Sequence, residues 1–381
     1  MSISIKSLIN FSTMVLCLFF LLVSCPISAK DSFQYCGYWD SPIDKLVKGD
    51  GLTCGDSCRI YISDRIQDAN GDRYIVGSIT GKLTYGNIES GSDGDYDYFV
   101  MKCNKDTGFK WFRRGEIKSI DGATVVKVDN KGGIYIVGYS SDCTDCKGCD
   151  HDFFVTKYDD MGNEISFQTG DTGFDDNPYD ADIRINSNGD VDIFVVGSTM
   201  SNSQNSGVSS YENMFVADFL FQKGHDPLIK WLTIDGDEKY SDAGEIVKVD
   251  KNGFVYVAGY TAGGFGGYTN NLKKFAFPEY IGRRDVFIAK YDEEGKRLGV
   301  VQSGTEEYDS IKDISFQYKK DGDIVLDAKG NTWAQPKEIL FGNKNTFGVV
   351  TVRDHYTEEI SLDQTSKVEF DFKSVTPGVV Y

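Results

Sequence analysis

Short runs of alternating apolar and polar residues, separated by turn sequences, recur along the chain. The clearest example spans 125–141 and reads VVKVDNKGGIYIVGYSS: a β-branched run, a DNKG turn and a second apolar run. Alternation with a period of two on both sides of such a turn is typical of a β-hairpin. The phrase returns 121 residues later, at 246–262, as IVKVDKNGFVYVAGYTA. The pattern predicts a chain built from repeated hairpins.

Looser copies of this first hairpin occur at 68–80, 183–199 and 314–328. The glycine that ends its second strand falls at steps of 61, 59 and 62 residues, at Gly77, Gly138, Gly197 and Gly259. In the last copy, Ala328 stands where we expect this glycine. The even spacing indicates one structural unit repeated along the chain.

A second hairpin follows each first one. It reads DYFVMKCNKDTGFKW from Asp97, DFFVTKYDDMGNEI from Asp152 and DVFIAKYDEEGKRL from Asp285, with looser copies at Asn213 and Thr346. Each unit of about 60 residues therefore supplies four strands, named A to D here, and five units run from 58 to 363. Four antiparallel strands that must stack on their neighbours to bury both faces are typical of a β-propeller blade.

The two phrases resemble the beta-propeller repeat family of extracellular proteins. The family pattern is Asp-x-Phe-Val-x-Lys-Tyr-Asp, a Trp, and then Val-Asp-x-x-Gly-x-x-Tyr-Val-x-Gly, and the second and fourth units match it well. The resemblance covers most of the chain and implies a fold without an activity. The predicted fold class is all-β: a single propeller of five four-stranded blades, or of six, over 58–381. A strand at 366–375 could close the ring with the N-terminal segment 30–57.

The first 29 residues predict an export signal. Lys6 precedes an apolar run at 14–23 that is short for a membrane span, and Ala29 offers a small residue for cleavage. LVSC, ending at Cys25, also resembles a lipoprotein cleavage box, which would leave a lipid anchor at Cys25, and an uncleaved signal anchor is a third reading. All three place the body of the chain outside the cytosol, either secreted or at the cell surface.

Export makes disulfides the default interpretation of the cysteines. Seven of the nine lie beyond residue 29, an odd number. Cys103 replaces the Tyr of a C strand and is expected to be a buried thiol. The spacing of Cys143, Cys146 and Cys149 would also permit Zn²⁺, with His151 or a distant cysteine as fourth ligand. The disulfide candidates are Cys36, Cys54, Cys58, Cys143, Cys146 and Cys149.

Ligand contacts are expected in the long B–C loops, which emerge on one face of a propeller. The longest runs from 260 to 284 and combines aromatic residues with a basic cluster on an acidic protein; the alternative is a loop that packs on its neighbour. The candidate ligand-binding residues are Tyr260, Phe265, Tyr268, Lys273, Lys274, Tyr280, Arg283 and Arg284.

Four aspartates precede or begin the A strands: Asp121, Asp180, Asp242 and Asp309. No cofactor is expected, but as a ring at one mouth of the channel these aspartates could hold Ca²⁺. Alternatively, each aspartate caps its own turn through backbone N–H groups. The turns DANGD and DKNGF lack the spacing of a Ca²⁺ loop and are interpreted as hairpin turns.

Composition and motifs favour binding over catalysis. With 58 acidic and 40 basic residues the formal charge is −18, which disfavours nucleic acid and anionic membranes as partners. The chain has three histidines, no serine in a nucleophile elbow and no phosphate-binding loop. The acids repeat with the blades, whereas catalytic acids should be singular. We therefore predict a non-enzymatic protein that binds a protein or glycan; the alternative is a propeller hydrolase that acts on glycans through carboxylates at the channel mouth.

Overall fold

A computed structural model describes residues 52–354, except for 55–58, 82, 86–87, 91–95, 105, 116, 118–119, 142–149, 201–210, 237–239, 266–283, 304–308, 319, 321–323 and 333–348. The described part is built from β-strands and turns, and it contains no helix that could span a membrane. The predicted signal sequence and the closing strand at 366–375 lie outside the described residues.

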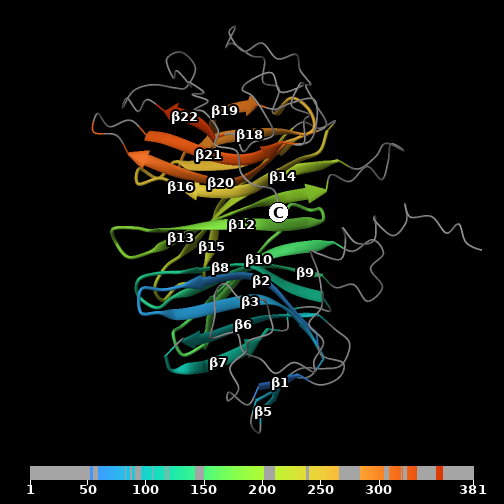
Figure 1. Ribbon diagram of the computed structural model, residues 1–381, viewed down its shortest axis with the longest axis vertical. Helices are drawn as coiled ribbons and strands as arrows, with labels where there is room; N and C mark the ends of the chain where they lie inside the picture. Colours follow the sequence, from blue (N-terminus) through green and yellow to red (C-terminus); the bar gives the residue numbers. More distant parts are fainter. Residues whose placement is uncertain are drawn as a thin grey trace, which may run out of the picture.

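Five antiparallel sheets follow one another in chain order (Figure 1). The first contains β2 (Arg59–Gln67), β3 (Asp72–Thr80), β6 (Asp97–Asn104) and β7 (Gly108–Arg114), and the second contains β8 (Ile120–Val128), β9 (Ile134–Ser141), β10 (His151–Tyr158) and β11 (Glu164–Gly170). The third contains β12 (Asp176–Ile185), β13 (Val191–Met200), β14 (Glu212–Phe221) and β15 (Leu228–Asp235), and the fourth contains β16 (Asp242–Val249), β17 (Val255–Thr261), β18 (Asp285–Tyr291) and β19 (Arg297–Ser303). The fifth contains β20 (Asp309–Tyr318), β21 (Ile324–Thr332) and β22 (Val349–Asp354).

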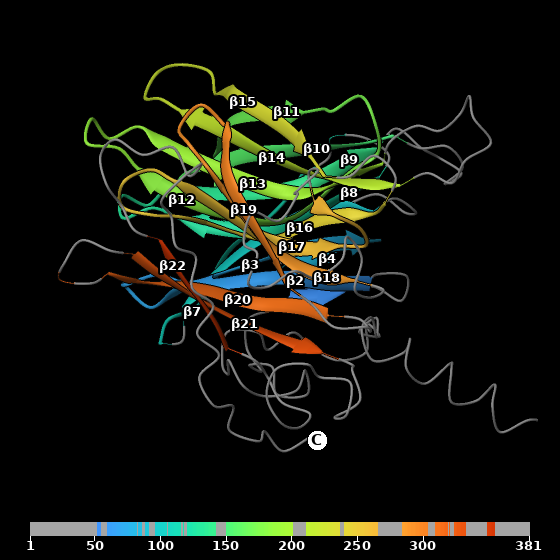
Figure 2. The same cartoon turned by 90° about the horizontal axis from the view of Figure 1, so that it is seen from above.

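These sheets confirm the predicted all-β propeller, and they show the order A–B–C–D in the first four units and A–B–C in the described part of the fifth. Each sheet packs on the next one, and the A strands β2, β8, β12, β16 and β20 contact one another in series. Seen from above, the third sheet has β15 at its outer side and β12 nearer the middle (Figure 2). A small sheet joins β1 (Leu52–Cys54) to β4 (Leu83–Tyr85) and β5 (Ile88–Ser90) in the first B–C connection.

The cores between the sheets consist of the apolar positions of the two repeated phrases. One cluster joins Tyr135 and Val137 of the second sheet to Ile193 and Phe215 of the third. The A–B turns of the first and fourth sheets confirm the hairpin interpretation: Asp68 Oδ1 accepts the N–H of Asn70 at 2.9 Å, and Asp250 Oδ1 accepts that of Asn252 at 2.8 Å.

A bulge interrupts every A strand at the same place. In the fourth sheet the pairing register between β16 and β17 shifts between Gly244 and Ile246, so that Glu245 is the extra residue. The extra residues of the other sheets are Ser63, Thr124, Tyr179 and Lys312. A bulge leaves one residue without a cross-strand partner and redirects its side chain.

The repeated glycine is required by this bulge. A Cβ atom on Gly259 would lie 1.9 Å from the backbone oxygen of Ala243, and one on Gly77 would lie 1.8 Å from that of Tyr61. In the fifth sheet, the residue paired just before the bulge is Gly330, opposite Ile311. The expectation that Ala328 takes the place of this glycine was therefore wrong by two residues, because β21 continues further than the sequence pattern indicates.

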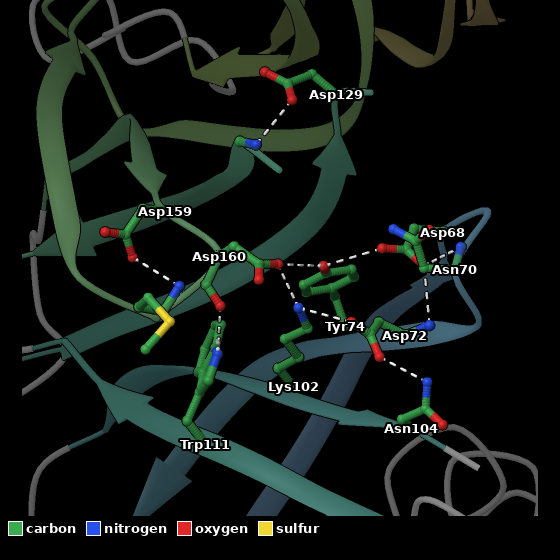
Figure 3. Close-up of polar contacts among 12 residues, drawn as sticks. Asp68, Asn70, Asp72, Tyr74, Lys102, Asn104, Trp111, Asp129, Asp159 and Asp160 are labelled. Carbon is green, nitrogen blue, oxygen red and sulfur yellow. Dashed lines mark hydrogen bonds and ion pairs between the residues drawn. The ribbon is translucent and has the colours of Figure 1, made fainter. Parts of the chain in front are cut away.

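In sheets one and three, a tryptophan of the D strand donates a hydrogen bond to the C–D turn of the next sheet. Trp111 Nε1 donates a hydrogen bond to the Asp160 backbone oxygen at 3.0 Å, and Trp231 Nε1 donates to that of Glu293 at 2.9 Å. Figure 3 shows Asp160 beside Trp111, Tyr74 and Lys102, whose ammonium also contacts Asp72 at 2.8 Å.

The even-numbered sheets lack this tryptophan. Ser166 in the second sheet and Gly299 in the fourth occupy the equivalent position, as their pairing with Lys157 and Lys290 shows. The near-identical phrases at 125–141 and 246–262 belong to sheets two and four, and each of these sheets accepts a hydrogen bond from a tryptophan of the preceding sheet.

Candidate functional site

Aromatic and charged side chains gather at the B–C edge of the third and fourth sheets, where the A strands begin and the long connections leave. They come from five strands and from the residue preceding β18. The cluster, called the edge cluster below, consists of Tyr179, Ser198, Glu212, Glu245, Tyr260 and Arg284.

Tyr260 and Arg284 form one half of the edge cluster. The Tyr260 hydroxyl donates a hydrogen bond to Glu212 Oε2 at 2.8 Å, and the Arg284 guanidinium carbon lies 3.7 Å from the centre of the Tyr260 ring. Burial and this hydrogen bond to Glu212 raise the pKa of Tyr260, so its hydroxyl remains a donor at physiological pH. The arginine is held against the ring by a cation–π contact, which restricts its movement.

The bulge residues form the other half. Tyr179, the bulge residue of β12, shares a hydrogen bond of 2.9 Å with the Ser198 hydroxyl. Glu245, the bulge residue of β16, is partly buried, and its Oε2 has no hydrogen-bond partner in the described part of the chain. Burial raises the pKa of the Glu245 carboxyl, while Arg284 and the Ile311 backbone oppose this effect. A carboxyl in such a place can bind an incoming donor or hold a proton.

The edge cluster departs from the repeat. Its two bulge positions carry Tyr179 and Glu245, whereas the other sheets carry Ser63, Thr124 and Lys312 there. Sequence reasoning missed Tyr179, Ser198, Glu212 and Glu245 because it followed the residues that recur. The signal that could have found them is a side chain that differs from those of the other sheets at a position that every sheet repeats.

The predicted ligand residues divide into three groups. Tyr260 and Arg284 belong to the edge cluster, although Tyr260 is largely buried. Phe265 is fully buried and stacks on Phe287, with ring centres 3.9 Å apart, so its side chain serves the core rather than a ligand surface. The remaining candidates lie outside the described residues: Tyr268, Lys273, Lys274, Tyr280 and Arg283.

The four predicted calcium ligands do not form one ring. Asp121, Asp242 and Asp309 are buried at the beginnings of their strands, and Asp121 Oδ2 accepts the N–H of Ile117 at 2.7 Å. The equivalent residue of the third sheet is Asp176, which starts β12, rather than Asp180.

Asp180 lies beyond the bulge, and its Oδ2 accepts the N–H of Val247 at 3.1 Å, so it joins two A strands. The described residues contain no group of three or more acidic, histidine or cysteine side chains that could hold a metal ion. The ring was therefore a wrong prediction for the described structure. The hydrogen bond of Asp121 fits the alternative in which these aspartates cap local backbone.

Cys103 is a buried free thiol in the core of the first sheet, as expected from its position in a C strand. Among the predicted disulfide cysteines, the structure describes only the backbone of Cys54, in β1. The others, Cys36, Cys58, Cys143, Cys146 and Cys149, lie outside the described residues, so their pairing stays a prediction.

A buried carboxyl beside the edge cluster makes stability depend on pH. Asp285 accepts a hydrogen bond from Gln302 Nε2 at 2.8 Å, and burial, together with nearby Asp309, raises its pKa to about 6. An unfolded aspartate has a pKa of about 3.9, so the folded chain binds this proton more tightly. The contribution of Asp285 to stability is therefore largest below about pH 4 and is lost as the pH rises through about 6.

We expect Asp285→Asn to be more stable than the wild type above pH 6, by about 2 kcal/mol, because no charge remains to be buried. Urea unfolding at about pH 4.5 and about pH 7.5 measures the difference. A variant whose stability falls with pH as steeply as that of the wild type would contradict the assignment to Asp285.

Comparison with known proteins adds a likeness in fold. No protein-family model matches the chain, and no curated protein matches it. Among solved structures, a thermostable family-43 glycoside hydrolase matches over 84% of this chain and 96% of its own, with a TM-score of 0.32 and 12% identity. At these values the likeness carries no argument about activity. The strands and their order identify the chain as an all-β propeller.

Proposed function

We propose that the protein is a non-enzymatic binding protein, secreted or displayed at the cell surface, that engages a protein or glycan through the edge cluster. The observation that carries the proposal is the placement of singular tyrosine, glutamate and arginine side chains at repeated positions of the third and fourth sheets. The long connections 201–210 and 266–283 leave from the same edge. Sites on a rigid scaffold beside variable connections are where proteins usually bind their ligands.

The chemistry of the edge cluster suits a partner with several polar groups. Glu212 and Glu245 supply carboxylate acceptors, and Tyr179 and Tyr260 present rings together with hydroxyl groups. Arg284 lies near Glu245 and both tyrosines, so it balances part of the negative charge of the cluster. Tyrosine and arginine contribute strongly to recognition because they combine a large contact area with directed hydrogen bonds.

The test is binding to a glycan array and to extracellular protein extracts by the wild type and by Arg284→Gln. We expect the variant to bind its partner at least about ten-fold more weakly, which is the loss of one charge-assisted contact. Lys223→Gln, which removes an exposed charge from the β14–β15 turn, is the matched control and should bind like the wild type. A partner that binds both variants equally would show that the edge cluster is not the binding surface.

One observation favours a second candidate, a hydrolase acting on glycans. Burial raises the pKa of Glu245, as a general acid requires, and Glu212 offers a second carboxylate in the same cluster. Chromogenic glycosides distinguish the two functions. Turnover that Glu245→Gln abolishes while the fold is kept would support the hydrolase and defeat the binding protein.

A further inference from the structure

The ring of sheets has an open position between the fifth sheet and the first. Consecutive sheets pack on each other, and their A strands contact one another in series from β2 to β20. Figure 1 shows β20 and β21 towards one end of the molecule and β2 and β3 towards the other, with the third sheet between them. The first and last described sheets are therefore apart, and a closed propeller needs a further sheet between them.

The first sheet has an apolar face on the side away from the second sheet. Its side chains form a cluster of their own, in which every described member belongs to the first sheet. The buried members, which are 0–3% exposed, are Ile60, Ile75, Ile79, Phe99, Met101 and Cys103. The second sheet cannot provide this burial, because it packs on the opposite face, which carries Tyr98 and Val100. The Phe99 face therefore needs a layer of its own.

The Phe99 face corresponds to the side of the second sheet that receives the sheet before it. Counted from the repeated glycine, Phe99 of the first sheet stands where Phe154 of the second sheet stands. Phe154 packs against Tyr98 of the first sheet, with ring centres 5.1 Å apart. Phe99 is thus placed to pack against a sheet that precedes the first one in the ring.

The fifth sheet carries the residue type by which the first and third sheets contact the next A strand. Asp64, directly after the bulge of β2, accepts the N–H of Val126 at 2.9 Å, and Asp180, directly after the bulge of β12, accepts that of Val247 at 3.1 Å. Asp313 stands directly after the bulge of β20. The second and fourth sheets have an apolar residue at this position. The alternation pairs each odd-numbered sheet with the one that follows and indicates a sixth sheet after the fifth.

The segment 366–375, which lies outside the described residues, has the pattern that the next A strand needs. Apolar and charged residues alternate in VEFDFK at 368–373, which is typical of a strand with one buried face. Pro377 and Gly378 follow, a pair that favours the tight turn needed before a B strand. The residues 355–365 leave room for the D strand of the fifth sheet, because the D strands of the other sheets have seven or eight residues.

The two sides of this segment match the two faces that it would meet. The side of β20 away from the fourth sheet is polar and exposed at Asp313 and Ser315, whereas the Phe99 face of the first sheet is apolar. A strand with Val368, Phe370 and Phe372 on one side can bury these side chains against the first sheet and direct its charged side to the fifth.

We propose that the propeller has six sheets and that residues 366–375 form the A strand of the sixth, between β20 and β2. The apolar side of this strand packs towards Ile60 of β2, and the sixth sheet covers the Phe99 face, including the thiol of Cys103. This interaction does not depend on the function proposed for the edge cluster.

Photo-cross-linking of the full chain tests the position of the segment. Phe370→p-benzoylphenylalanine keeps an aromatic residue on the apolar side of the strand, and we expect it to cross-link within one molecule to peptides of β2 or β3. The control carries the same photoreactive residue in place of Ile234, which is 45% exposed in β15, and should give no cross-link to the first sheet. Mass spectrometry of the digested monomer identifies the linked peptides.

The thiol of Cys103 reports whether the Phe99 face is covered. We expect Phe370→Asp to raise the rate at which iodoacetamide alkylates Cys103 by at least about ten-fold, because a charge on the apolar side of the strand favours opening of the sixth sheet. Asp371→Asn changes the opposite side of the strand and should leave this rate as in the wild type. Hydrogen exchange of β13 and β14 should be the same in all three proteins, which would show that the third sheet stays folded.

The proposal is overturned if residue 370 cross-links to a second molecule or to no peptide of the first sheet. It is also overturned if Cys103 reacts as slowly in Phe370→Asp as in the wild type, while Trp39→Asp in the N-terminal segment makes it reactive. If Phe370→Asp alters hydrogen exchange in the third sheet as well, the cross-link alone decides.

Discussion

Replacing Trp111 with alanine is expected to lower the free energy of unfolding by about 3–5 kcal/mol, the usual cost of removing a large buried aromatic side chain. Trp111 is 9% exposed and packs in the cluster that joins the first two sheets. The substitution also leaves the backbone oxygen of Asp160 without its donor, at 3.0 Å in the wild type. Guanidinium unfolding monitored by circular dichroism measures the change.

The repeat supplies the comparison for this variant. Trp231→Ala removes the same contact between the third and fourth sheets and should cost a similar free energy. Ile165→Ala, at an exposed position of the second sheet, should change stability by less than about 0.5 kcal/mol. If Trp111→Ala lowered the free energy of unfolding as little as Ile165→Ala does, the tryptophan contact would not be important for the packing of the first sheet on the second.

Replacing Gly259 with alanine is the second large change, with an expected loss of about 3 kcal/mol. The added Cβ would lie 1.9 Å from the backbone oxygen of Ala243, a residue of the neighbouring strand β16 that is paired with Tyr260 of β17. Backbone on both sides cannot give way without breaking the pairing at the bulge. The same measurement of unfolding applies.

Gly224→Ala is the control for Gly259→Ala, because it introduces backbone strain at a positive φ without a steric clash. Gly224 has a φ of 79°, and nothing lies within 4 Å of the atom that the substitution adds. The cost there should be about 1–2 kcal/mol, the penalty for a non-glycine residue at a positive φ. Equal losses in the two variants would mean that the bulge does not require glycine for close approach.

The sequence predicted the hairpins and their order well because both depend on neighbours along the chain. Alternating residues such as those at 125–128 select one buried face, and an aspartate such as Asp129 bonds the backbone of its own turn, with its Oδ1 2.7 Å from the N–H of Lys131. The glycine spacing marked the second strand of four sheets. It failed in the fifth, where Gly330 rather than Ala328 faces the bulge.

The candidate site was predicted only in part. Tyr260 and Arg284 were found because their loop is long and rich in aromatic and basic residues. Phe265 came from the same loop, yet it stacks on Phe287 in the core, since an aromatic ring near a strand end can bury its surface there. Asp180 was grouped with the wrong aspartates because the third A strand has an aspartate on each side of its bulge, Asp176 and Asp180. Only the pairing with β13 shows that Asp176 is the one that matches Asp121 and Asp242.

By itself the sequence determined a chain of repeated hairpins, five units long, whose local patterns each specify strand, turn and buried face. Only the tertiary structure decided which side chains meet. Tyr179 and Glu245 are 66 residues apart, yet both stand at a bulge of an A strand and both lie near Arg284. No local pattern encodes that meeting, because a bulge is defined by the partner strand and the neighbouring sheet brings the two bulges together. The packing of one sheet on the next thus brings together side chains that are not repeated in the other sheets, and these form the candidate site.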